Sequence, residues 1–127
     1  VIRQCSSIKR EGQGGTWITR EMVKAYLSLH ERGIAKSVEV WKENELVGGF
    51  YGIDLIDVFC GESMFSKVSN ASKCGFTHFV THYSHQYKII DCQIYSSYLE
   101  QLGAIEIPFK EFACFLDSQR VKNLHFK

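Results

Sequence analysis

Residues 36 to 52 read Lys-Ser-Val-Glu-Val-Trp-Lys-Glu-Asn-Glu-Leu-Val-Gly-Gly-Phe-Tyr-Gly, and this stretch decides the expected fold. Val38 and Val40 alternate with their neighbours as far as Lys42, which is the period of a β-strand with one buried face. Residues 43–45 carry turn-forming chemistry, and a second apolar run follows over residues 46–52. The stretch therefore predicts a β-hairpin with strands at 36–42 and 46–52.

The segment before the hairpin has the apolar spacing of an α-helix. Thr19 is a suitable N-cap, Glu21 falls in the first turn, and Gly33 is placed to end the helix. One apolar stripe at helical spacing lies between these residues and is made of Met22, Ala25, Tyr26 and Leu29.

Strands and helices are expected to alternate after the hairpin. The sequence predicts a third strand at 55–60, a loop at 62–68, and a helix that starts near Ser69 or Asn70. The apolar stripe of that helix is formed by Phe76, Phe79, Val80 and Tyr83. A strand at 88–94 and short helices at 97–102 and 110–116 complete the order. An antiparallel start with a β-α-β-α tail predicts an α+β (or α/β) fold, a mixed sheet flanked by helices.

Composition limits the classes of protein that fit. A chain of 127 residues suits one domain. Fifteen basic residues against fourteen acidic residues give a formal charge of +1, so overall charge does not indicate a nucleic-acid-binding protein. The five cysteines stand singly, which argues against a disulfide framework or a zinc site and favours a cytoplasmic protein. No apolar run is long enough to span a bilayer.

Asp91 and Gln93 form a polar pair inside an apolar run. Residues two apart on a strand share a face, so both side chains are expected to point away from the face of Ile90 and Cys92. Ligands of open α/β sheets lie beyond the carboxyl ends of strands, and this pair comes late in its strand. The spacing therefore favours a site, with a solvated strand face as the alternative.

Several short strings along the sequence are unusual in combination. They are Thr16-Trp17-Ile18-Thr19, Glu39-Val40-Trp41, Leu46-Val47-Gly48-Gly49, residues 61–73, Asp91-Cys92-Gln93 and Leu102-Gly103-Ala104. Through these strings, which occur in the family's order, the chain resembles the bacterial leucyl/phenylalanyl-tRNA protein transferases along almost its whole length. The resemblance implies an acyl-CoA N-acyltransferase-like catalytic domain over residues 1–127, with the family's smaller N-terminal domain absent from this chain.

The resemblance also implies a reaction and its partners. Leucine or phenylalanine would pass from aminoacyl-tRNA to the α-amino group of proteins with N-terminal arginine or lysine, by aminolysis of the ester. The product would enter the cytoplasmic N-degron route of protein degradation. The resemblance implies no metal, no coenzyme and no membrane partner, and we expect a monomer.

Asp91 and Gln93 match the catalytic residues proposed for the family. The carbonyl of Gln93 would orient the attacking amine, because an amide is too weak a base to take its proton. Asp91 would hold that amide and stabilise the developing ammonium. Glu62 would attract the cationic acceptor, although its position alone fits a surface carboxylate or a helix-cap partner equally well.

The donor end of the family's site needs a platform for adenine and an apolar slot. Trp17 matches the family's stacking tryptophan, and base-on-aromatic stacking contributes roughly 1–3 kcal/mol; Trp41 is the weaker candidate. The aminoacyl-adenosine site would also include Tyr26, Phe50, Met64, Phe79 and Ile90. Periodicity alone assigns these residues to the core, and the usual role of a buried tyrosine is packing with one hydrogen bond.

Three other interpretations remain open from the residues. An acyl-coenzyme A enzyme would need a glycine-containing pyrophosphate turn, and residues 68–73 contain no glycine. A nucleophilic Cys92 would point to the apolar face, and no histidine spacing ties a base to it. The third is a truncated binding module without turnover.

The contacts to tRNA are weakly indicated. Lys67 stands where the family most often has arginine, so it keeps the charge but loses bidentate geometry. The remaining basic residues form only a loose cluster, made of Lys9, Arg10, Arg20, Arg120, Lys122 and Lys127.

Overall fold

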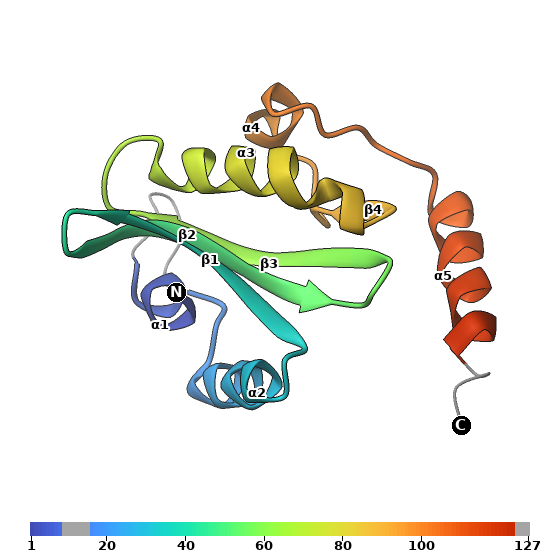
Figure 1. Cartoon of the computed structure of the whole chain (residues 1–127), viewed down its shortest axis with the longest axis horizontal. Coiled ribbons are helices and arrows are strands. Elements are labelled where there is room, and N and C mark those ends of the chain that lie inside the picture. The colour runs from blue at the N-terminus through green and yellow to red at the C-terminus, as the bar shows by residue number, and fades with distance from the viewer. Residues whose placement is uncertain (9–15, 124–127) are drawn as a thin grey trace. The chain divides into compact units, whose positions relative to one another are not determined.

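The computed structural model describes residues 1–8 and 16–123, with side chains described as far as Ser118. The chain divides into two compact units, Val1–Gln93 and Ile94–Lys127. The first unit contains a four-stranded sheet with helices on both faces (Figure 1). Within the described part of the chain, none of the helices has both the length and the apolar character needed to cross a bilayer.

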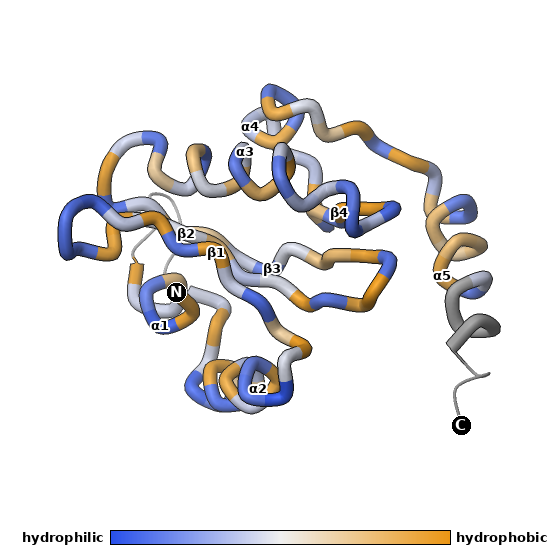
Figure 2. Tube along the Cα trace, viewed as in Figure 1, coloured by the Kyte–Doolittle hydropathy of each residue, from blue (hydrophilic) through white to orange (hydrophobic). Residues whose placement is uncertain are grey.

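The predicted hairpin is confirmed. Strand β1 (Ala35–Lys42) pairs antiparallel with β2 (Glu45–Asp54), and Lys42 faces Glu45 across the turn. Glu43 takes a positive φ of 55° in that turn. Figure 2 shows the turn in hydrophilic colours. The polar residues between the two apolar runs therefore mark the turn, as the sequence indicated.

The rest of the sheet follows the predicted order but not the predicted bounds. Strand β3 (Val58–Ser66) pairs antiparallel with β2, and β4 (Ile89–Asp91) pairs parallel with β3, so the sheet order is β1-β2-β3-β4. This is the mixed sheet of an α+β fold, as expected. The predicted loop at 62–68 was wrong over residues 62–66, because pairing with β2 keeps β3 extended to Ser66.

Helices α1 (Ile2–Ser7) and α2 (Arg20–Glu31) lie on one face of the sheet (Figure 1). Thr19 caps α2 as predicted, its Oγ1 accepting the backbone N–H of Met22 at 3.2 Å. The buried cluster on this face consists of Ile2, Cys5, Ile18, Tyr51 and Phe65. The α2 residues packed against it are Met22, Val23, Tyr26 and Leu27. Ala25, predicted on the stripe, is exposed, so the buried face is rotated toward Val23 and Leu27.

Helix α3 (Ala71–Tyr83) covers the other face and is followed by the short 3-10 helix η1 (Ser84–Gln86) (Figure 1). It begins after Asn70, as predicted, and Asn70 has a positive φ of 62°. Phe59 packs against Phe50 and Phe79 with ring centroids 6.1 and 4.7 Å away. Tyr83, predicted on the buried stripe, is 45% exposed. The core on this face is therefore aromatic and centred on β2, β3 and the middle of α3.

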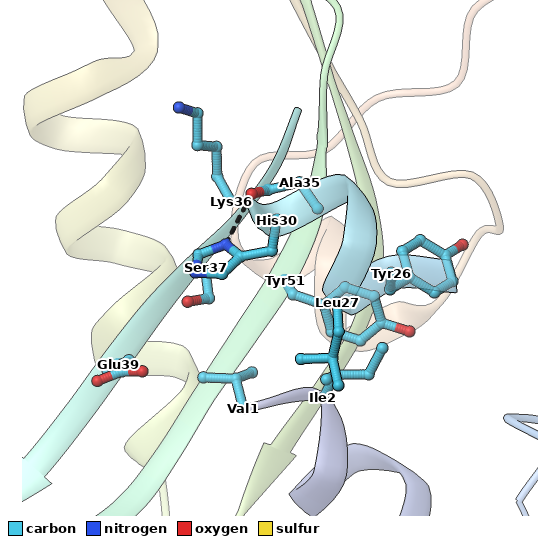
Figure 3. Close-up of a pocket in the computed structure, with 10 residues that line it drawn as sticks. All are labelled: Val1, Ile2, Tyr26, Leu27, His30, Ala35, Lys36, Ser37, Glu39 and Tyr51. Atoms are coloured by element: carbon cyan, nitrogen blue, oxygen red, sulfur yellow. Dashed lines mark hydrogen bonds between the residues drawn. The ribbon is translucent and has the colours of Figure 1, made fainter. Parts of the chain in front are cut away.

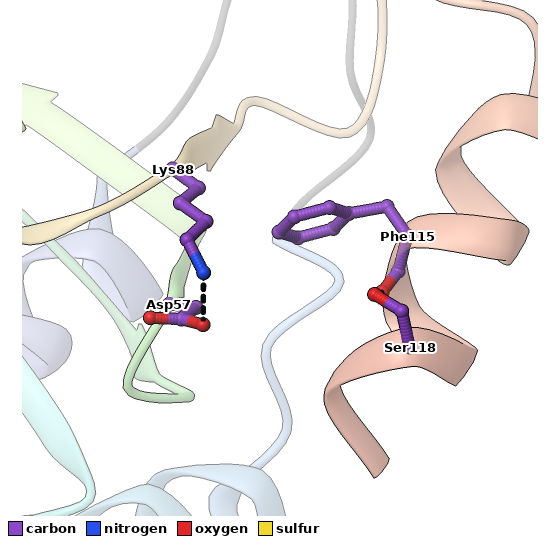
Figure 4. Close-up of polar contacts among 4 residues, drawn as sticks. All are labelled: Asp57, Lys88, Phe115 and Ser118. Carbon is purple, nitrogen blue, oxygen red and sulfur yellow. Dashed lines mark hydrogen bonds and ion pairs between the residues drawn. The ribbon is translucent and has the colours of Figure 1, made fainter. Parts of the chain in front are cut away.

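Asp57 connects the beginnings of β3 and β4. Its carboxylate forms an ion pair with Lys88, with Nζ and Oδ2 2.8 Å apart (Figure 4). Its backbone carbonyl accepts the N–H groups of Lys88 and Ile89 at 2.8 and 3.3 Å. These contacts fix the register in which β4 enters the sheet.

The second unit contains α4 (Ser97–Gln101) and α5 (Phe109–Asn123). Ser96 caps α4 by accepting the N–H of Leu99, and Gly103 ends it with a φ of 92°. Within α5, the Ser118 hydroxyl donates to the carbonyl of Phe115 at 2.6 Å (Figure 4). Both short helices were predicted, although α5 extends further than residue 116.

The contact between β2 and α3 generates a stability prediction. A Cβ on Gly48 would lie 2.5 Å from Cβ of Ala71 and 3.0 Å from its carbonyl carbon. We expect Gly48→Ala to lower the free energy of unfolding by about 1–3 kcal/mol, because overpacking moves backbone as well as side chains. Urea unfolding of the complete protein that contains this chain measures the change. The control is Gly61→Ala, whose added Cβ meets only the Asp91 carbonyl oxygen, at 3.5 Å. Equal unfolding free energies for the two variants would contradict the prediction.

Candidate functional site

A β-bulge places Glu62 on β3. Tyr51 pairs with Ser63 and Gly52 pairs with Gly61, so Glu62 has no partner residue on β2. A bulge leaves its extra residue outside the ladder and redirects the side chain. The bulge therefore lets Glu62 extend toward α2 and toward the end of β4.

Glu62 accepts two hydrogen bonds from residues that are distant in sequence. The hydroxyl of Tyr26, on α2, donates to Oε2 at 2.7 Å. The side-chain Nε2 of Gln93 donates to Oε1 at 3.2 Å. Each carboxylate oxygen thus has its own donor, and Glu62 joins α2 to the segment after β4.

Asp91 and Gln93 are linked by a local turn. Strand β4 ends at Asp91, and the backbone N–H of Gln93 donates to Asp91 Oδ1 at 2.8 Å. Gln93 has a positive φ of 65°. The predicted strand at 88–94 was therefore wrong beyond Asp91. The Asp91 carboxylate therefore holds the backbone of Gln93, the Gln93 side-chain amide bonds instead to Glu62, and strand alternation does not place the two side chains.

The site is electrostatically negative. Burial, followed by the negative charges of Asp91 and Glu62, raises the pKa of Cys60 to about 11. Burial, then the hydrogen bond to Glu62, also raises the pKa of Tyr26 above its usual value. For Cys92 the pKa is raised by burial and by Asp91. Burial and the nearby carboxylates both disfavour a further negative charge, so these thiols and the phenol stay protonated at neutral pH.

The apolar residues expected in the donor slot lie on the opposite face of the sheet from Asp91. Phe50 and Phe79 are 3% and 6% exposed and pack edge to face. Met64 pairs with Phe50 across β2 and β3, and Ile90 pairs with Phe59 across β3 and β4. Because paired residues share a face, these side chains surround one aromatic cluster beneath α3.

The two tryptophans are both surface residues. Trp17 is 47% exposed, next to the buried Ile18 in the segment before α2. Trp41 is 56% exposed, and its Nε1 donates to Glu39 Oε2 at 3.0 Å. An exposed ring has a face free of core packing, which is the condition that base stacking requires.

A cavity of about 160 Å³ lies between α1, α2 and the β1–β2 hairpin (Figure 3). Tyr26 and Leu27 line it from α2, and Tyr51 lines it from β2. His30 donates through Nδ1 to the carbonyl of Ala35 at 2.9 Å on the same wall. The ring of Tyr26 therefore borders this cavity while its hydroxyl reaches Glu62.

Some predicted contacts lie outside the network or outside the described residues. Lys67 forms an exposed ion pair with Glu45, with Nζ and Oε1 3.2 Å apart. Of the loose basic cluster, only Arg20 has a described side chain; Lys9, Arg10 and Lys127 lie outside the described residues, as do the side chains of Arg120 and Lys122.

Cys60 lies in the candidate site but was not among the residues predicted from the sequence. The sequence shows that Cys60 lies two residues before Glu62. Its proximity to Asp91, however, depends on the pairing of β3 with β4. No sequence pattern reports that pairing.

Comparison with known proteins identifies the family. The sequence model described as leucyl/phenylalanyl-tRNA protein transferase matches residues 1–117. The chain belongs to this family. The family resemblance inferred from the short strings is thereby confirmed.

Curated relatives in the leucyl/phenylalanyl-tRNA protein transferase family are strongly similar. The transferase of Flavobacterium johnsoniae is 59% identical over 120 residues, covering 94% of this chain and 57% of the relative. The Christiangramia forsetii transferase is 59% identical over 119 residues, covering 91% and 56%. The Escherichia coli O81 transferase is 48% identical over 125 residues, covering 98% and 52%. The chain thus spans about half the length of the curated relatives it matches.

The raised thiol pKa values predict an order of cysteine reactivity. With a pKa of about 11, Cys60 at pH 8 carries about one thiolate per thousand molecules. We expect exposed Cys74 to react with iodoacetamide well before Cys60. Below pH 11 the labelling rate of Cys60 should rise about tenfold for each pH unit. Mass spectrometry of timed, quenched digests measures both rates. Labelling of Cys60 as fast as Cys74 at neutral pH would contradict the assigned environment.

Proposed function

We propose that the protein containing this chain transfers leucine or phenylalanine from aminoacyl-tRNA to proteins that begin with arginine or lysine. Membership of the transferase family supports the reaction class. The observation that carries the proposal is the network of Tyr26, Glu62, Gln93 and Asp91 at the end of β4. It combines two carboxylates with an oriented carboxamide.

The proposed reaction is aminolysis of an ester. The nitrogen of the acceptor's free α-amine attacks the carbonyl carbon that joins the amino acid to the tRNA 3′ end. A C–N bond forms, the bond from that carbon to the ribose oxygen breaks, and the proton lost by nitrogen ends on the ribose oxygen. An α-ammonium has a pKa near 8, so about a tenth is free amine at neutral pH. The ester is already activated, and orientation of the amine is the main task left to the protein.

The residues divide this task by their chemistry. Gln93 accepts a hydrogen bond from the attacking amine through its carbonyl oxygen, which aims the nitrogen lone pair. Asp91 stabilises the positive charge that develops on nitrogen, and it holds Gln93 through the backbone N–H. Glu62 and Asp91 together favour a cationic acceptor, since both carboxylates act on the same half-buried region.

The donor is proposed to bind through apolar contacts and stacking. Trp17 would stack on the terminal adenine, and Tyr26 would border the aminoacyl-adenosine. The amino-acid side chain would enter the aromatic cluster lined by Phe50, Met64, Phe79 and Ile90. One methylene changes binding by only about 1–3 kcal/mol, so leucine and phenylalanine would both be accepted. We place this activity in the cytoplasmic N-degron route.

Turnover with matched acceptors tests the proposal. The complete protein should transfer phenylalanine from phenylalanyl-tRNA to a peptide beginning with arginine and not to one beginning with alanine. We expect Asp91→Asn and Gln93→Ala to lower kcat at least tenfold with donor Kd nearly unchanged, because both act in the transition state. The measurements are product formation by mass spectrometry and donor binding by filter retention.

The control is Glu45→Gln, which removes an exposed carboxylate at the hairpin turn. Exposed ion pairs contribute little, so this variant should keep full activity. Equal transfer to both peptides would refute the proposed acceptor preference. A fall in donor affinity matching the fall in kcat would refute the roles assigned to Asp91 and Gln93.

A further inference from the structure

The hydrogen bonds at Glu62 determine how the Gln93 carboxamide is oriented. An ionised carboxylate only accepts hydrogen bonds, so the group that Gln93 presents to Glu62 is its NH₂. The carbonyl oxygen then occupies the other position of the planar amide, pointing away from Glu62. Under the proposed function, that oxygen is the atom that receives the acceptor amine.

The Glu62 carboxylate can hold the Gln93 amide in one orientation only if its own orientation is constrained. The residue sits in a bulge, where the ladder to β2 does not constrain it. The other oxygen of Glu62 accepts the Tyr26 hydroxyl at 2.7 Å, and this is the shorter of its two hydrogen bonds. Charge-assisted bonds of this length are strong. Tyr26 thus limits the rotation of the carboxylate that holds the amide.

Tyr26 is rigidly held on its own element. Its ring contacts Tyr51 edge to face, with centroids 5.0 Å apart and an angle of 73°. It also packs against the buried cluster beneath α2. The raised pKa of Tyr26 means that the phenol stays a donor throughout the pH range of an assay. A rigid donor on a packed helix can set the geometry of a carboxylate on a bulge.

We propose that Tyr26 is a positioning residue that acts through Glu62 to hold the Gln93 carboxamide with its oxygen toward the acceptor amine. This inference rests on the proposed function, since it concerns the step that Gln93 performs. It differs from a donor-contact role for Tyr26. A donor contact contributes to affinity for aminoacyl-tRNA, whereas positioning through Glu62 contributes to kcat.

The variant that separates the two roles is Tyr26→Phe in the complete protein. It removes the hydroxyl and keeps the ring that packs on Tyr51. We expect kcat with phenylalanyl-tRNA and an arginine peptide to fall about tenfold. Without the hydroxyl, the Gln93 carboxamide is no longer held in place, so it orients the attacking amine less well. The Kd for phenylalanyl-tRNA should stay within about twofold of wild type, since the variant keeps the ring that would border the aminoacyl-adenosine.

A double-mutant cycle that combines Tyr26→Phe with Glu62→Gln tests whether Tyr26 acts through Glu62. Residues that act as one unit give non-additive effects, so adding Tyr26→Phe to Glu62→Gln should lower kcat little further. The matched control is Tyr87→Phe. It removes a phenol hydrogen-bonded to Asp54, and its ring packs on Phe59 and Phe79 beneath α3. This variant should leave kcat unchanged.

Exchange of the Gln93 side-chain amide protons gives a readout that does not depend on turnover. In wild-type protein, NMR should show slow exchange for the proton donated to Glu62, and Tyr26→Phe should accelerate it severalfold. The inference is overturned if Tyr26→Phe keeps wild-type kcat and exchange, if it acts only on donor Kd, or if the two substitutions are additive. An inactive wild type would instead count against the proposed function, and the exchange measurement would still decide the role of Tyr26.

Discussion

The parallel pairing of β3 with β4 is the constraint on which the candidate site depends. It comprises only the pairs Val58 with Ile89, Phe59 with Ile90, and Cys60 with Asp91. Asp57 fixes its beginning through two backbone hydrogen bonds and an ion pair to Lys88. Phe59, which is buried among the aromatic rings beneath α3, stabilises the middle of this pairing.

The register of β3 and β4 brings the residues of the site together. Because it places Asp91 beside Cys60, Gln93 reaches Glu62, which is 31 positions away in the sequence. A slip of one residue would exchange the faces of Ile90 and Asp91 and separate the carboxylates.

The same alternation separates two chemical environments on one short strand. Ile90 shares its face with Phe59 and the aromatic cluster, whereas Asp91 shares its face with Cys60. At this end of β4, the aromatic core therefore lies on one side of the sheet and the Asp91 carboxylate lies on the other. In the proposed reaction this division suits the substrates, since an apolar amino-acid side chain of the donor and a positively charged acceptor have to be recognised close to each other. A strand end provides both, because adjacent side chains point to opposite faces.

Local patterns predicted the elements whose residues carry their own signals. The hairpin followed from strand alternation and a polar turn, and α2 followed from helical spacing with Thr19 as its cap. The strand character of residues 61–66 was missed, because glycine and serine there resemble a loop and only pairing with β2 makes them extended. The end of β4 was also misjudged, since a positive φ at Gln93 has no sequence signal. Asp91, Gln93, Glu62 and Tyr26 were selected by family resemblance, but their mutual hydrogen bonds depend on the docking of α2 and on the bulge.

The partners of Glu62 support a cationic acceptor more directly than its negative charge alone does. In the described part of the chain, the groups that donate to Glu62 are a phenol and a carboxamide, both neutral. Neutral donors fix the position of a carboxylate without cancelling its charge, whereas an ion pair would do both. That charge adds to the effect of burial on Cys60, whose pKa is raised by burial and then by Asp91 and Glu62. A half-buried carboxylate pair of this kind is stabilised by a positively charged ligand, because like charges repel and the opposite charge is not supplied by these partners. In the proposed reaction the acceptor's basic N-terminus supplies that charge, so binding and orientation of the amine depend on the same residues.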